Sequence, residues 1–67
     1  MARNNDPVEV NCTYVRRAGA SIVIEDAEGK ELLLPLSQIQ LDPERPDPME
    51  NLTVTMPEWL AVNRGLV

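Results

Sequence analysis

Short runs in which apolar residues occupy every second position are the feature that most constrains this chain. A period of two is typical of a half-buried β-strand, because successive side chains of a strand point to opposite faces. Glycine and proline, which favour turns, lie between most of the runs. The pattern therefore predicts five short antiparallel strands. The runs cover residues 7–14, 21–25, 31–34, 39–41 and 51–56.

The last residues of the chain follow a helical spacing instead. Thr55 and Glu58 fit a capping box, and Gly65 stands where a C-terminal cap is expected. A helix of two turns is not stable alone in water, so we expect it to dock on the sheet. The apolar stripe predicted for it consists of Trp59, Val62 and Leu66. Tryptophan is also common in binding hot spots, but its place on this stripe favours core packing.

Size and cysteine content limit how such a chain can be stabilised. Sixty-seven residues form one domain with a thin core, and one cysteine without any histidine allows neither an internal disulfide nor a Cys/His zinc site. The core must be aliphatic, and association with a second copy stays open. We expect a disordered tail at residues 1–6, then a mainly β, small α+β domain over residues 7–67. Five strands and a covering helix indicate an SH3-like or OB-like small barrel.

Acidic residues are concentrated in the middle of the chain. The net charge is −5, and the span 25–50 holds eight acidic residues against Lys30 and Arg45. Such a surface repels phosphate backbones and favours a protein partner with a basic surface. Within this span, three prolines in residues 42–50 predict an exposed loop. The candidate protein-binding residues are Glu25, Asp26, Glu28, Glu31, Asp42, Glu44, Asp47 and Glu50.

A basic pair at an expected hairpin tip supports an alternative function. Arg16 and Arg17 could contact phosphates, with Tyr14 stacking on a base, as in a small-barrel factor that binds single-stranded nucleic acid. The whole chain has only six basic residues, whereas nucleic-acid-binding modules are usually basic overall. The charge balance therefore argues against this alternative.

No pattern in the chain predicts catalysis, a metal site or a cofactor site. Cys12 alternates with valines, which points it inward, and no histidine is present to activate it. The acidic loop lacks the glycine that a calcium-binding loop needs for its sharp turn. We therefore expect no enzyme, no metal and no cofactor.

Signals for export or membrane insertion are also missing. No apolar stretch approaches 18 residues, and the first residues do not resemble a signal peptide. The tripeptides Asn11-Cys12-Thr13 and Asn51-Leu52-Thr53 match the glycosylation sequon, and we interpret both as chance matches. Together with the free cysteine, these observations predict a cytoplasmic protein without membrane contact.

Two segments resemble small proteins encoded by bacteriophages and prophages. Residues 34–39 are similar to an "LPKSQI" segment of those proteins, and residues 53–67 resemble their "V-PEWLA-KGL" ending, which is the more specific part. Two positions differ, because Leu33 and Leu36 stand where the family has Trp and Lys. The resemblance covers roughly residues 8–67. It implies a phage origin and a cytoplasmic location, and it assigns no catalytic residue.

The charge pattern and the resemblance together predict a function. We expect a small acidic phage-encoded module that binds a protein, as an inhibitor of a host nucleic-acid-handling or defence system of the anti-CRISPR or anti-restriction type. Phosphate-binding sites on such targets are basic, and an acidic surface could occupy them.

Overall fold

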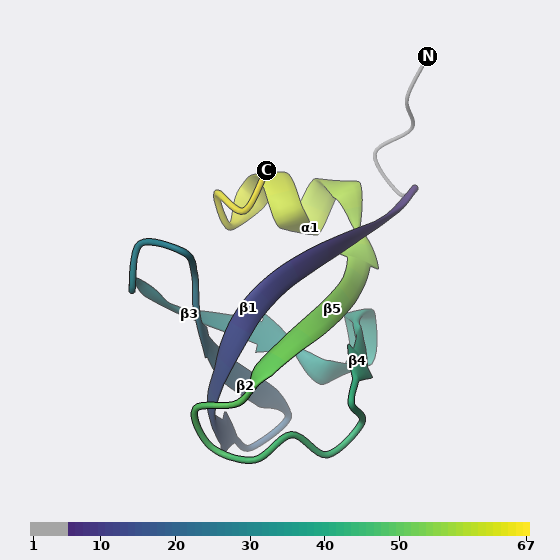
Figure 1. The fold of residues 1–67 in the computed structure, drawn as a ribbon. Helices are drawn as coiled ribbons and strands as arrows, with labels where there is room; N and C mark the ends of the chain where they lie inside the picture. Colours follow the sequence, from purple (N-terminus) through teal and green to yellow (C-terminus); the bar gives the residue numbers. More distant parts are fainter. Residues whose placement is uncertain (1–5) are drawn as a thin grey trace.

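A computed structural model of the chain describes residues 6–67. It contains one antiparallel sheet and one short C-terminal helix, which confirms the predicted mainly β domain (Figure 1). Of the disordered tail expected at residues 1–6, all but Asp6 lies outside the described residues. The elements are β1 (Pro7–Ala18), β2 (Ser21–Glu25), β3 (Glu31–Pro35), the 3₁₀ turn η1 (Leu36–Gln38), β4 (Gln40–Asp42), β5 (Asn51–Pro57) and α1 (Glu58–Asn63).

The five strands follow the order β3-β2-β1-β5-β4. Strand β1 is the long central strand, and it pairs with β5 along its first half and with β2 along its second half. Thr13 has a partner on both sides. The edge strands β3 and β4 do not pair with each other within residues 6–67, so the sheet is open. An SH3-like or OB-like small barrel was expected, but the sheet does not close, and β4 has only three residues with which to pair.

A β-bulge makes β1 longer than the sequence pattern predicted. The alternation indicated that the strand ended before Arg16, whereas pairing with β2 continues to Ala18. The register shifts between Tyr14 and Arg16, which leaves Val15 as the extra residue. A bulge bends the strand and increases its twist, so β1 can serve both halves of the sheet.

The core lies inside the curved sheet and is entirely aliphatic apart from the thiol of Cys12 and the thioether of Met56. Alternate residues of β1 and β5 supply half of it, as the period of two predicted. Its buried members are Val10, Cys12, Ile22, Ile24, Leu34, Leu52, Val54, Met56, Leu60 and Ala61. Removing this apolar surface from water is the main force that holds the fold together.

The helix buries a different face from the one predicted. Leu60 and Ala61 are buried, whereas Trp59 is 43% exposed and Val62 is 58% exposed. The predicted role of Trp59 in closing the core is therefore wrong. The physical reason is the direct connection to β5: Met56 is buried at the strand end, and the helix begins two residues later.

The two ends of α1 differ in how well they were predicted. The capping box is wrong, because Thr55 lies within β5 and the N-cap, Pro57, makes no side-chain cap hydrogen bond. The C-terminal cap at Gly65 is confirmed by a φ of 72°. The amide of Gly65 donates to the carbonyl of Val62 (3.0 Å) and that of Leu66 to the carbonyl of Ala61 (2.8 Å), which is a Schellman motif.

Candidate functional site

Neutral polar side chains line the outer face of β1 and β5. Asn11 lies directly opposite Thr53, and Thr13 lies opposite Asn51. The hydroxyl of Thr53 donates to the amide oxygen of Asn11 at 2.9 Å. In the same way, the hydroxyl of Thr13 donates to the amide oxygen of Asn51 at 3.3 Å. We call these four residues the polar ladder. They are the Asn and Thr residues of the two sequon matches.

An open hollow of about 450 Å³ lies beside the polar ladder. Three carboxylates line it, and they come from the β2–β3 hairpin and from the end of β4. None of the described residues around it is Lys or Arg. We call it the acidic hollow. Its lining consists of Asn11, Cys12, Thr13, Glu25, Asp26, Ala27, Asp42, Asn51, Leu52 and Thr53.

The hairpin holds one of these carboxylates in place. The Oδ1 atom of Asp26 accepts hydrogen bonds from the amides of Glu28 and Lys30, both at 2.9 Å. The amide of Gly29 donates to the carbonyl of Asp26 (3.0 Å), and Gly29 has a φ of 82°, a conformation that glycine adopts easily. The predicted turn at residues 26–30 is therefore confirmed, and it fixes Asp26 at the rim of the hollow.

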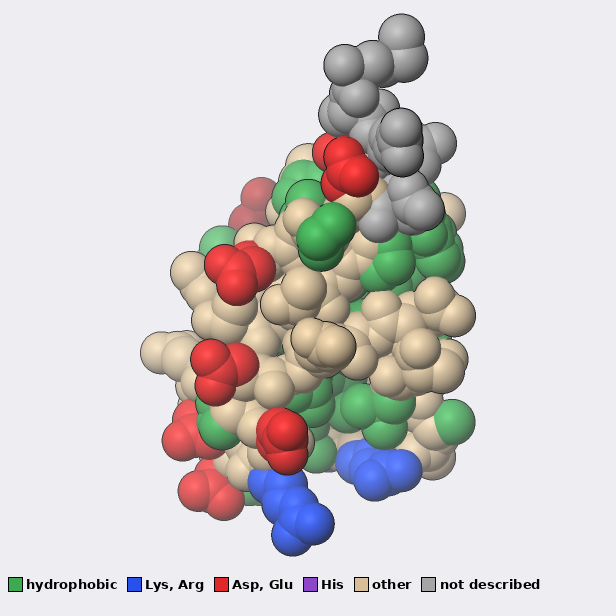
Figure 2. Space-filling model, turned by 90° about the vertical axis from the view of Figure 1, so that its right-hand side faces the viewer, with side chains coloured by type: hydrophobic (Ala, Val, Ile, Leu, Met, Phe, Trp, Pro, Cys, Tyr) green, Lys and Arg blue, Asp and Glu red, His purple; other side chains and the backbone are tan. Residues whose placement is uncertain are grey.

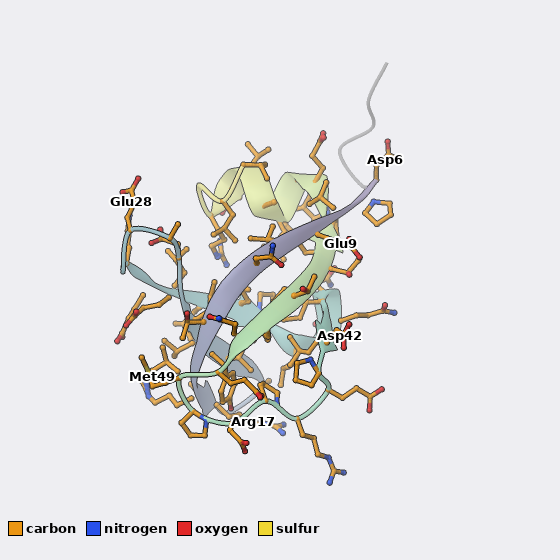
Figure 3. The ribbon with its side chains drawn as sticks, in the orientation of Figure 1. Asp6, Glu9, Arg17, Glu28, Asp42 and Met49 are labelled. Atoms are coloured by element: carbon orange, nitrogen blue, oxygen red, sulfur yellow. The ribbon has the colours of Figure 1, made fainter. Side chains whose placement is uncertain are left out.

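The eight predicted acidic residues do not form one continuous surface. Glu25, Asp26 and Asp42 meet at the acidic hollow. Figure 3 places Glu28 at the tip of the β2–β3 hairpin, on the opposite side of the molecule from Asp42. The residues that do not line the acidic hollow are Glu28, Glu31, Glu44, Asp47 and Glu50.

The predicted basic pair is divided between the two faces of the sheet, because successive residues of a strand point to opposite faces. Arg17 pairs with the core residue Ile22, whereas Arg16 pairs with Val23, so the two arginines occupy opposite faces of the sheet. The Nε atom of Arg17 donates to the carbonyl of Gly19 at 2.9 Å. Figure 3 shows Arg17 at the lower end of the sheet, near the loop between β4 and β5.

A second hollow of about 370 Å³ opens at this end of the sheet. Aliphatic and aromatic residues line it together with two guanidinium groups, and we call it the arginine hollow. On the face shown in Figure 2, basic side chains gather at the lower end, next to exposed apolar side chains. Its lining consists of Tyr14, Arg17, Ile22, Leu36, Leu41, Glu44, Arg45 and Pro46.

Sequence reasoning missed Arg45 as a candidate. It was counted only as one of two basic residues in an acidic span, and nothing in its immediate neighbours indicates a site. The loop that carries it is joined to β1 by backbone hydrogen bonds at the bulge. The amide of Met49 donates to the carbonyl of Tyr14 (2.6 Å), and the amide of Tyr14 donates to the carbonyl of Glu50 (2.9 Å). The loop is thus more closely attached to the sheet than its composition suggested.

Burial keeps the thiol of Cys12 in its protonated form. Cys12 is buried, and desolvation raises its pKa from 9.0 to about 11, so the thiol stays protonated at neutral pH. Within residues 6–67, no three His, Cys, Asp or Glu side chains are placed to hold a metal ion. None of the described helices is long and apolar enough to cross a membrane.

Comparison with known proteins identifies no relative of this chain: no family model, no curated protein and no solved structure matches it. A function must therefore be inferred from the two hollows and the charges around them.

Proposed function

We propose that this chain is a small acidic protein-binding module, whose acidic hollow receives a basic surface of its partner. The observation that carries the proposal is the meeting of Glu25, Asp26 and Asp42 around one hollow that is free of basic side chains among the described residues. The two acidic segments of the sequence thus contribute to a common site. The similarity of the chain ending to phage-encoded proteins supports a target in a host nucleic-acid-handling or defence system.

Electrostatics within the sheet also support a basic partner. Glu25 and Glu31 lie directly opposite each other on β2 and β3. Like charges in this position destabilise a sheet, and a cationic side chain from a partner would relieve the repulsion. A surface of this kind accelerates association with a positively charged protein, and salt weakens the effect.

Nucleic-acid binding by Tyr14, Arg16 and Arg17 is the second candidate. In its favour, Tyr14 and Arg17 both line the arginine hollow, where Arg45 joins them. Against it, Arg16 belongs to the other face, and the chain carries a net charge of −5. Titration with single-stranded DNA tests this candidate, because phosphate contacts produce a steep dependence of affinity on salt.

The type of small barrel also stays a proposal. We favour the SH3-like type over the OB-like type, with a barrel that is left open between β3 and β4. The tight connections between the strands support this choice, since β3 reaches β4 through the single turn η1. An experimental structure in which the sheet is flat, so that the edge strands β3 and β4 do not curve toward each other, would contradict it.

Two variants of equal charge test the acidic hollow. The first carries Glu25→Gln, Asp26→Asn and Asp42→Asn, which removes the three carboxylates of the hollow. An amide oxygen at residue 26 can still accept the two hairpin hydrogen bonds. The control carries Glu28→Gln, Glu44→Gln and Asp47→Asn, which removes three charges elsewhere. Partners are captured from a bacterial lysate with the unmodified chain and then purified.

The association rate with a captured partner should fall about tenfold or more for the first variant and much less for the control. The loss should shrink as salt is raised, because screening weakens the attraction in the unmodified protein as well. Equal losses in both variants would mean that net charge alone acts and that the hollow is not the contact. Unchanged association in the first variant would contradict the proposal.

A further inference from the structure

The arginine hollow has the floor of a binding pocket. Ile22 is buried at its base, and the side chains of Leu36 and Leu41 are half-buried around it. Pro46 from the loop between β4 and β5 forms part of the wall. Ligand pockets are commonly apolar concavities of about 300–1,000 Å³ with a few polar groups, and this hollow falls at the lower end of that range. It has room for one or two side chains of a partner.

Its rim carries two guanidinium groups that form no ion pair with the described residues. Within residues 6–67, the side chain of Arg17 makes one hydrogen bond, from Nε to the carbonyl of Gly19, which orients the side chain and leaves both terminal nitrogens available. Arg45 is exposed and makes neither a hydrogen bond nor an ion pair with the residues of the 6–67 range. A guanidinium binds carboxylates through two parallel hydrogen bonds, and beside an apolar surface such bonds are strengthened.

We propose that the arginine hollow is a second binding site, which receives a peptide segment with an aliphatic or aromatic side chain next to a carboxylate. The apolar side chain would lie on Ile22 and Leu41, and the carboxylate of an adjacent Asp or Glu would bind Arg17. Arg45, which the loop between β4 and β5 carries, would contact the same carboxylate or the next one. This site does not depend on the acidic hollow, because it has the opposite charge and shares no residue with it.

A peptide fits these observations better than a nucleic acid. Glu44 also lines the hollow, and the chain as a whole is acidic, so a polyanion would meet repulsion around the site. A peptide needs only one carboxylate and can supply a neutral backbone elsewhere. The floor is mainly aliphatic, with Tyr14 as its one aromatic member, and therefore suits a side chain better than a series of stacked bases.

The test uses a phage-displayed library of random decapeptides, selected on the immobilised full chain. The variants are Arg17→Gln and Arg45→Gln, and the matched control is Arg16→Gln, which removes the same charge from the other face of the sheet. Peptides from each enriched family are synthesised, and their affinities for all four proteins are measured. Amide shifts in NMR spectra then locate each peptide, and thermal melting verifies that the variants are folded.

We expect one enriched family with Asp or Glu adjacent to Leu, Ile or Phe. Its affinity should fall about tenfold or more with Arg17→Gln and stay unchanged with Arg16→Gln, since a bond to a charged group is lost only in the first case. Amide shifts should appear at Ile22, Leu36 and Leu41. A selection that yields no acidic-apolar family, or one whose peptides bind Arg17→Gln equally well, would overturn the proposal.

A nucleic-acid probe serves as the competing arm. Oligothymidylate should bind no more tightly to the unmodified chain than to Arg17→Gln. If its binding required Arg17 and Arg45 and fell steeply with salt, the hollow would belong to a nucleic acid, and the peptide proposal would be wrong.

Discussion

The hydroxyl of Thr53 donates a hydrogen bond of 2.9 Å to the amide oxygen of Asn11 on the neighbouring strand, although the two residues are 42 positions apart in the chain. Thr13 and Asn51 repeat the arrangement two residues along, with a longer bond of 3.3 Å. Each Asn-x-Thr tripeptide places its Asn and Thr on one face of its strand, and the antiparallel register sets each Asn opposite a Thr. The two sequon matches thus have a structural role in pairing β1 with β5.

The two bonds of the polar ladder should contribute unequally to stability. Thr53→Ala should lower the free energy of unfolding by about 1 kcal/mol, as expected for a cross-strand pair with a good hydrogen bond. Thr13→Ala should cost less, because its bond to Asn51 is longer. Chemical denaturation of both variants measures the difference. Equal losses would show that the lost β-propensity of threonine, which is common to both positions, outweighs the hydrogen bonds.

The exposed position of Trp59 leads to a prediction about the helix. Trp59→Ala should lower the free energy of unfolding by only about 1 kcal/mol, because much of the ring already contacts water. Leu60→Ala should cost about 2–5 kcal/mol, because it leaves a cavity in the core. Thermal melting of the two variants compares them directly. If Trp59→Ala were the more damaging change, the helix would be rotated relative to this structure.

Met49 adopts a backbone conformation that favours glycine. Its φ is 65°, and its side chain is 62% exposed, so little packing compensates for the strain. Met49→Gly should raise the melting temperature slightly, since the left-handed region costs about 1–2 kcal/mol for other residues and glycine regains part of this. Met49→Val should lower it, because a β-branched side chain is least tolerant of a positive φ. The reverse order would mean that the Met49 side chain makes a stabilising contact.

The buried thiol predicts a loss of stability in alkali. The pKa of Cys12 is about 11 in the folded protein and 9.0 as its reference value. Between these values the unfolded chain loses the proton while the folded chain keeps it, so unfolding becomes easier as the pH rises above about 9. The loss should approach about 2 kcal/mol near pH 11.

A variant without the thiol separates Cys12 from the other groups that titrate in alkali. Cys12→Val should show a smaller decrease in stability between pH 8 and pH 11 than the unmodified protein, under reducing conditions. The unmodified protein should also react slowly with thiol reagents in its native state and rapidly in denaturant. Parallel pH profiles for the two proteins would mean that Cys12 is not the group responsible.

The sequence by itself determined the elements that depend on local patterns. Alternation predicted all five strands, although β1 proved longer and β4 is displaced by one residue from the predicted run at 39–41. Asp26 and Gly29 predicted the hairpin turn, and Gly65 predicted the end of the helix. These features succeed because each follows from the geometry of a few neighbouring residues: the period of a strand, or the positive φ that glycine tolerates.

Only the tertiary structure decided which surfaces these elements present. The bulge at Val15 put Arg17, not Arg16, on the same face as Tyr14, and the loop brought Arg45 to the same hollow as Arg17. The direct connection from β5 to α1 determined that Leu60, not Trp59, is buried in the core. The physical reason is that a register shift, a helix rotation and a loop path depend on contacts between residues far apart in the chain, which local periodicity cannot encode.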